Sequence, residues 1–187
     1  MIYSIIGYYS LISGLCLGLI LIYFSVKNFK NSKLLDSKIL SFTFLQFFFV
    51  VISFLCLILS FVLSDFSNET VFNNSHTTKP LFYKIAGTWG NHEGSLLLWL
   101  FVLTLFILIF LARSKNQPIK YKILTLVFQQ IIIIGFFAFI ILTSNPFNYI
   151  YPTPIEGLGL NPILQDPALA IHPPILYLGY VGSSIIF

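Results

Sequence analysis

His172 is the residue of this chain whose type and setting best suit it to chemistry. It lies in the segment Asn161–Tyr180, at the start of an apolar run, and is followed directly by Pro173 and Pro174. Pro173 disfavours a helical backbone at His172, and a proline is tolerated in the first turn of a helix. The pattern predicts an imidazole just above the start of a membrane-spanning helix, on a stiff support. Such a side chain is suited to act as a ligand at the membrane surface.

A glycine-rich turn before another apolar run is the second candidate. Its residues are Trp89, Gly90, Asn91, His92, Glu93 and Gly94. One interpretation is structural: Asn91 or Ser95 caps the following helix, Glu93 lies near its positive end, and the tryptophan anchors the turn at the interface. The other is a functional surface, because His92 would face the same side of the membrane as His172. We assign the turn a structural or docking role.

The elements that must position these residues are membrane-spanning helices. The chain has 187 residues, of which 57% are hydrophobic and 9% charged, against about 25% charged in a soluble domain. We predict an all-α fold: one membrane domain, a polytopic helix bundle with four complete transmembrane helices and the start of a fifth. The predicted spans are residues 5–24, 39–63, 95–112, 123–143 and 175–187, and the outer loops are 64–94 and 144–174. Because the fifth span stops short, we expect a fragment of a longer protein or of a split gene.

Charged residues predict the orientation of the bundle. Eight of the ten basic residues lie in two short loops: Lys27, Lys30, Lys33, Lys38, Arg113, Lys115, Lys120 and Lys122. The positive-inside rule places these loops on the inner side, and therefore the N-terminus and the other two loops outside. The charge thus reflects topology and gives no case for nucleic acid. The first four spans contain no Asp, Glu, Lys, Arg or His, which counts against an unrelated transporter.

Three further expectations concern the contacts and order of the elements. Gln46 is expected to bond to a neighbouring helix, and residues 129–130, both Gln, to pack between helices. The outer loops are expected to touch through Trp89 and the segment 162–172. The stretch 65–79 is polar and without periodicity, which predicts a mobile loop.

Four segments, in order along the chain, resemble the N-terminal part of one protein family. They are Gly87-Thr-Trp-Gly-Asn-His-Glu-Gly-Ser95, Asn145-Pro-Phe147, Leu160-Asn-Pro-Ile-Leu-Gln-Asp-Pro167 and Ile171-His-Pro-Pro-Ile-Leu-Tyr-Leu-Gly-Tyr-Val-Gly182. Each lies beside the expected span. Together they resemble the CcmF family of cytochrome c-type biogenesis proteins, whose NrfE-type relatives share the pattern. The resemblance covers the whole chain.

The resemblance implies a function and partners. CcmF proteins are membrane subunits of the cytochrome c haem lyase, which holds haem on the outer face and attaches it to the Cys-x-x-Cys-His motif of apocytochrome c. The implied partners are the haem chaperone CcmE, CcmH-type subunits and apocytochrome c. The implied location is the bacterial or mitochondrial inner membrane, with the outer loops in the periplasm or the intermembrane space. His172 matches the family's first outer-face haem ligand by its His-Pro-Pro setting.

The rest of the family's haem-binding residues are absent from this sequence. The second outer-face histidine, the Trp-rich segment and the two intramembrane histidines lie further along in the family, and the other histidines here are His76 and His92. We therefore expect part of a haem lyase that is inactive alone and shares haem transiently with segments it lacks. The alternative is a non-catalytic haem-docking or scaffold fragment. No catalytic residue is assigned, and no metal other than the haem iron.

Overall fold

The computed structural model describes residues 1–27, 29, 35–159, 161 and 165–184. Within these residues the chain is helical, with one isolated β-bridge between Asn68 and Tyr149. Four helices are long and apolar enough to span a membrane: α1 (Ile2–Lys27), α2 (Leu35–Val62), α5 (His92–Arg113) and α6 (Ile119–Thr143). The shorter helices are α3 (Glu69–Asn74), α4 (Leu81–Gly87) and α7 (Pro167–Ser183). The predicted all-α membrane bundle with four complete spans is confirmed.

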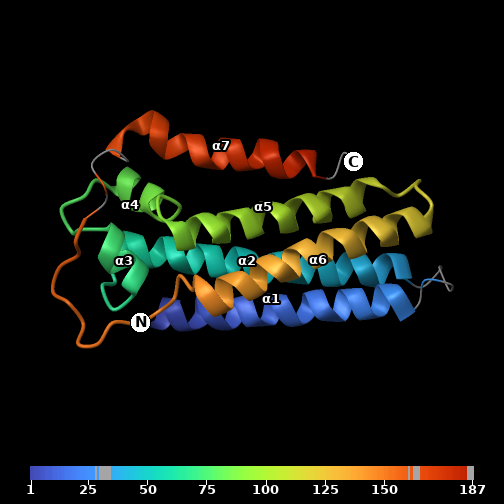
Figure 1. Cartoon of the computed structure of the whole chain (residues 1–187), viewed down its shortest axis with the longest axis horizontal. Coiled ribbons are helices and arrows are strands. Elements are labelled where there is room, and N and C mark those ends of the chain that lie inside the picture. The colour runs from blue at the N-terminus through green and yellow to red at the C-terminus, as the bar shows by residue number, and fades with distance from the viewer. Residues whose placement is uncertain (28, 30–34, 160, 162–164, 185–187) are drawn as a thin grey trace.

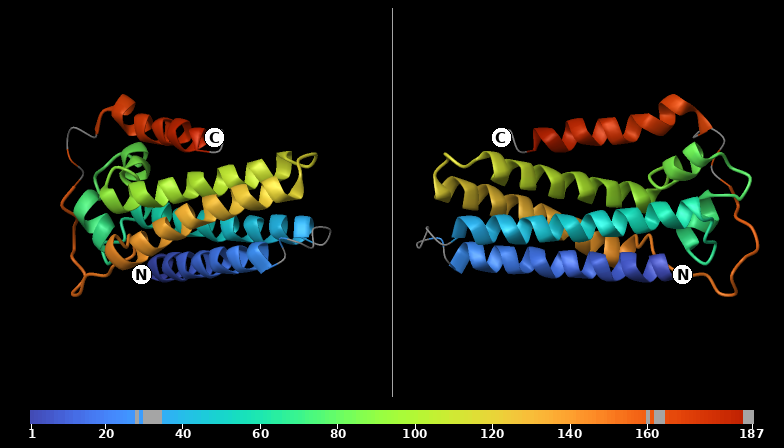
Figure 2. Two further views of the ribbon diagram at one scale, coloured as in Figure 1. Left: turned by 45° about the vertical axis from the view of Figure 1, so that its right-hand side comes forward. Right: turned by 180° about the vertical axis from the view of Figure 1, so that it is seen from behind.

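The four long helices lie side by side, and α7 lies outside them against α5 (Figure 1). Figure 2 shows the same arrangement from two further sides, with α1 and α7 on opposite edges of the bundle. One end carries the N-terminus, α3, α4 and the connection from α6 to α7, and we name it the loop end. The opposite end, which carries the α1–α2 and α5–α6 connections, is named the basic end. All the candidate site residues lie at the loop end.

Small residues and one pair of amides hold α1, α2 and α6 together. A Cβ added to Gly14 would lie 2.7 Å from the Phe137 ring, and one added to Gly18 would lie 2.8 Å from Gln46 Nε2. Gln46 Nε2 donates to the Gly14 carbonyl at 3.2 Å and to Gln130 Oε1 at 3.1 Å, and Gln130 Nε2 donates back to Gln46 Oε1 at 2.7 Å. Both glutamines are fully buried. Their pairing satisfies polar groups where no water is available, and it confirms the expected bond from Gln46.

The stretch 65–79 differs from the predicted mobile loop, because it contains α3 and is bonded to its surroundings. Asn68 is fully buried. Its Oδ1 caps α3 by accepting from the Val71 N–H at 3.0 Å. Its Nδ2 donates to the Pro146 carbonyl at 2.9 Å and to Ser4 Oγ at 3.1 Å. The buried polar side chain in this stretch thus caps a helix and bonds to other elements, and does not face solvent.

The two connections at the loop end are also bonded to each other. The Leu158 N–H donates to the Phe72 carbonyl at 2.8 Å. The Glu156 carboxylate accepts from the Thr77 N–H at 3.0 Å and from Thr77 Oγ1 at 2.6 Å. These bonds lower the pKa of Glu156 below its ordinary value, the Thr77 hydroxyl contributing most. The described part of the α6–α7 connection is therefore held against α3 rather than free.

Candidate functional site

The turn from Trp89 to Gly94 forms the start of α5. Asn91 caps the helix, because its Oδ1 accepts a hydrogen bond from the Gly94 N–H at 2.7 Å. Gly94 is required, since a Cβ there would overlap the carbonyl oxygen of Thr88. Ser95 Oγ donates to the Trp89 carbonyl at 2.8 Å and so closes the turn. Of the two residues predicted as possible caps, Asn91 and Ser95, it is therefore Asn91 that caps α5.

The helix that carries His172 begins earlier than predicted. α7 starts at Pro167 rather than at residue 175, and it continues as a helix through the proline pair. His172 therefore lies inside the helix, and the prediction that Pro173 pushes it out of the helical region was wrong. The helix is initiated upstream, where Asp166 Oδ1 accepts from two backbone N–H groups at 2.8 and 3.1 Å and Pro167 occupies the first turn. This initiation outweighs the conformational preference of a residue that precedes proline.

Proline inside a helix leaves carbonyl groups without their usual donors. Pro174 has no N–H, so the carbonyl of Ala170, four residues earlier, loses its helical partner. Trp89 Nε1 donates to that carbonyl at 2.8 Å. The first turn of α7 runs at an angle to the rest of the helix (Figures 1 and 2), as expected near a proline. The predicted contact between Trp89 and the 162–172 segment is confirmed at Ala170, whereas residues 162–164 lie outside the described residues.

α7 has two opposite faces with different surroundings. The face towards α4 and α5 consists of Ala170, Pro173, Tyr177 and Val181. The opposite face, which we name the free face, borders an open groove of about 460 Å³ and consists of His172, Ile175, Leu176, Gly179, Tyr180 and Ser183. His172 is thus directed away from the four-helix bundle, at the end of the free face nearest the loop end.

The imidazole of His172 is exposed and makes no hydrogen bond with any residue that the structure describes. Either ring nitrogen is therefore available to an incoming metal centre. One helical turn further on, Ile175 and Leu176 provide an apolar surface beside the ring. A nitrogen ligand next to an apolar wall is a setting that suits a large, flat, mostly apolar metal complex such as haem.

His92 lies in a different groove from His172. This second groove, about 590 Å³, separates α5 from α7 and is bordered by aromatic rings, with Trp99 and Tyr177 at a centroid distance of 5.0 Å. His92 Nε2 lies 3.2 Å from Ser144 Oγ. Glu93 lines neither groove but borders a polar cavity of about 170 Å³ with Glu69. The side chains of the predicted turn therefore border two different cavities, and neither of these cavities contains His172.

The described residues contain no group of three or more His, Cys, Asp or Glu side chains close enough to hold a metal ion. Haem iron differs, because the porphyrin supplies four ligands and the protein needs to supply one or two. His172 alone can therefore provide one axial ligand. What the sequence did not reveal is the aromatic contact of Trp99 with Tyr177, since nothing in either local pattern indicates which helices pair.

Residues 89–187 match the protein family described as Cytochrome C assembly protein. The cytochrome c-type biogenesis protein CycK of Bradyrhizobium diazoefficiens is 48% identical over 185 residues, which are 97% of this chain and 28% of that protein. The cytochrome c-type biogenesis protein CcmF of Escherichia coli is 44% identical over 147 residues, 78% of this chain and 23% of that protein.

A solved structure described as the cytochrome c heme lyase CcmF superposes with a TM-score of 0.81. Sequence identity with it is 22%, and the match covers 98% of this chain and 29% of that one. The chain thus spans less than a third of the length of the relatives it matches, and the match to the solved structure is a match of fold. The chain is an integral membrane protein, and it belongs to the cytochrome c assembly protein family, among its CcmF-type members.

Proposed function

We propose that this chain is part of the membrane subunit of a cytochrome c haem lyase and supplies His172 as an axial ligand to haem. The observation that carries the proposal is the position of His172 on the free face of α7, exposed, without a described hydrogen-bond partner and beside an apolar groove. The relatives are described as cytochrome c-type biogenesis proteins, a process in which haem is the substrate to be attached.

Haem on this face would be held from one side by α7 and would need a second wall. His172 would bind the iron, and Ile175 and Leu176 would contact the porphyrin edge. The four-helix bundle lies behind α7, so the second wall must come from another segment or subunit. The length of the relatives, of which this chain spans less than a third, supports that arrangement. Covalent attachment to apocytochrome c would then take place in a site shared with those segments.

The proposed orientation places this site outside the membrane. The α5–α6 connection and the helix ends beside it carry four Lys and Arg residues between positions 113 and 122 and no Asp or Glu, which favours the inner side. The loop end, and His172 with it, would then face the periplasm or the intermembrane space. Haem delivered by CcmE and apocytochrome c presented by CcmH-type subunits would meet there without crossing the lipid.

The second candidate function is a haem-docking or scaffold role without catalysis. It is favoured by the separation of His172 and His92 into different grooves, so that no second described histidine lines the groove of His172. The two candidates differ in one measurable respect. A lyase component is needed for thioether formation after haem is bound, whereas a docking component is needed for haem retention alone.

The test replaces His172 at the native locus and follows mature cytochrome c by haem staining, with the amount of the membrane protein measured by immunoblot. His172→Ala should abolish or strongly reduce mature cytochrome c while the protein remains in the membrane, because alanine favours the helix that His172 occupies. His92→Ala is the matched control and should leave maturation intact. Added imidazole should partly restore maturation in His172→Gly, which a purely structural role would not allow.

Three results would separate the outcomes. Normal maturation in His172→Ala would refute the ligand role. If His172→Ala retains haem by absorption spectroscopy but forms no thioether, the site acts in attachment rather than docking. If haem is lost as well, attachment is measured with purified components and added free haem. Attachment that is restored at high haem concentration supports docking, because excess haem then compensates for weaker retention.

A further inference from the structure

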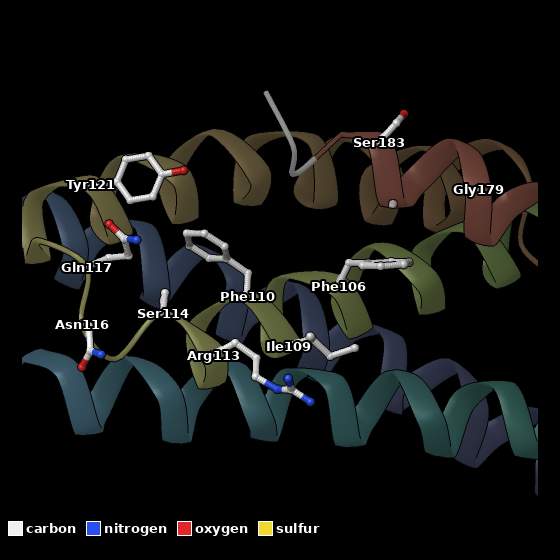
Figure 3. A pocket seen from close by; sticks show the side chains of 11 residues that line it. Phe106, Ile109, Phe110, Arg113, Ser114, Asn116, Gln117, Tyr121, Gly179 and Ser183 are labelled. Atoms are coloured by element: carbon white, nitrogen blue, oxygen red, sulfur yellow. The ribbon is translucent and has the colours of Figure 1, made fainter.

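A groove at the basic end, which adjoins the free face of α7 at Gly179 and Ser183, has the chemistry of a lipid site. We propose that it binds one anionic phospholipid, with the phosphate at Arg113 and an acyl chain along α5 and α7. The groove measures about 840 Å³ and lies where the end of α5, the α5–α6 connection and the second half of α7 meet. Figure 3 shows its side chains, with Asn116, Gln117 and Tyr121 at one side and Gly179 and Ser183 at the other.

The rim of the groove carries an uncompensated positive charge. Arg113 is exposed and forms no ion pair with any carboxylate that the structure describes. The exposed amides of Asn116 and Gln117 lie on the same rim and can donate hydrogen bonds. A guanidinium binds two phosphate oxygens at once, and amide donors can bind a third. The rim therefore complements an anionic group such as a phosphate and disfavours a cation.

The walls of the groove are apolar and continue away from this rim. Phe106, Ile109 and Phe110 face it from successive turns of α5. α7 contributes two glycines: a Cβ at Gly182 would lie 3.1 Å from the Phe106 ring, whereas one at Gly179 would have nothing within 4 Å. The second half of α7 thus stays close to α5 at Gly182 and leaves an open channel at Gly179. The open space at Gly179 and the apolar side chains of α5 that line the groove suit a hydrocarbon chain.

The position of the groove along the helices favours a lipid over a free phosphate. Arg113 and Tyr121 lie at the ends of two spanning helices, where head groups meet the hydrocarbon core. Basic pockets between helices at this level are typical sites for anionic head groups. A soluble phosphate would use the rim alone, and the apolar walls from Phe106 to Phe110 would then have no role. We therefore assign the groove to a phospholipid.

The experiment uses the natural protein, purified in mild detergent with the subunits that accompany it. Bound phospholipids are identified by native mass spectrometry, and binding is then measured with cardiolipin, phosphatidylglycerol and phosphatidylcholine of the same acyl chains. Arg113→Gln should weaken binding of the two anionic lipids about fivefold, the contribution of one basic side chain near an anionic surface. Lys115→Gln removes the same charge from the same connection without lining the groove, and it should leave binding nearly unchanged.

Gly179→Leu tests the apolar half of the site, because it fills the open space at Gly179, which also borders the free face, while it leaves Arg113 in place and favours the helix. It should reduce lipid binding as much as Arg113→Gln does. Equal losses in Arg113→Gln and Lys115→Gln would overturn the proposal, since they would indicate a diffuse basic surface. Competition by glycerol phosphate as strong as that by the lipid would also overturn it. A third result would overturn it: lipid binding stays unchanged in Gly179→Leu while the stability of the protein falls. The added leucine would then have displaced another protein helix from the groove and not a lipid.

Discussion

The indole Nε1 of Trp89 donates a hydrogen bond to the carbonyl oxygen of Ala170, at 2.8 Å. This bond joins the turn before α5 to the first turns of α7, across 81 positions of sequence. Its acceptor is the carbonyl that Pro174 leaves without a helical donor. The tryptophan turn thus supplies the donor of this contact, and the proline pair leaves the acceptor free to receive it. His172 lies two residues after that acceptor.

Trp89→Phe should loosen the first half of α7 without unfolding the bundle. Phenylalanine keeps an aromatic ring next to Phe54 but leaves the Ala170 carbonyl unpaired, at a cost of about 1–3 kcal/mol if it stays buried. The backbone N–H groups between positions 168 and 176, where all residues but the two prolines carry one, should exchange faster with deuterium, and haem attachment should fall. Trp99→Phe is the control, since Trp99 packs on Phe136 and on Tyr177 of α7 without a described N–H bond, and a phenyl ring keeps an aromatic contact with both. Equal exchange in both variants would show that the hydrogen bond does not hold α7.

Pro174→Ala should suppress the effect of Trp89→Phe. Alanine restores an N–H four residues after Ala170, so the carbonyl gains a donor within the helix and no longer depends on the indole. The double variant should therefore show slower exchange in α7 than Trp89→Phe alone, and the two changes should be non-additive. Additive effects would mean that Trp89 acts through packing alone. Exchange measured on the four proteins of the cycle decides the matter.

Local signals in the sequence predicted the elements of this fold and part of the site. The long apolar runs predicted the four spans, and Asn91 was one of the two residues predicted to cap α5. The path of the backbone at His172 was predicted wrongly, because a dipeptide preference was applied without the upstream cap at Asp166 that initiates the helix. The role of Asn68 was also missed. Its partners, Pro146 and Ser4, are distant in sequence, and no local pattern identifies them.

The Gln46–Gln130 pair should show the asymmetry expected of a buried polar pair. Gln130→Leu removes both hydrogen bonds between the two amides and leaves Gln46 Oε1 without its described donor in a water-free interior, so it should lower the stability of the bundle by about 1–2 kcal/mol. Replacing both glutamines with leucine should cost less than the sum of the single changes, because no polar group is then left unpaired. Thermal unfolding in detergent, followed by circular dichroism, measures all three variants. A double variant as unstable as the sum would indicate that the glutamines act independently.

The contact between Glu156 and Thr77 should depend on pH in one direction. The Thr77 hydroxyl and N–H hold the pKa of Glu156 below its ordinary value of 4.5, and the His76 ring, 3.9 Å away, acts in the same sense. A carboxylate with a lowered pKa in the folded state stabilises that state above its ordinary pKa, and this contribution is lost as the pH falls through the lowered value. The α6–α7 connection should therefore stay anchored at neutral pH and loosen only below about pH 4.5.

A spin label on Thr153→Cys, an exposed position of this connection, reports the loosening. In a background without Cys16 and Cys56, label mobility should be constant at neutral and mildly acidic pH and rise in stronger acid. Glu156→Gln cannot carry the negative charge, so its label mobility should not change with pH over this range. Glu69→Gln removes a carboxylate from the same end of the bundle without touching Thr77, and it should retain the acid transition. A transition that persists in Glu156→Gln would assign the pH dependence to another group.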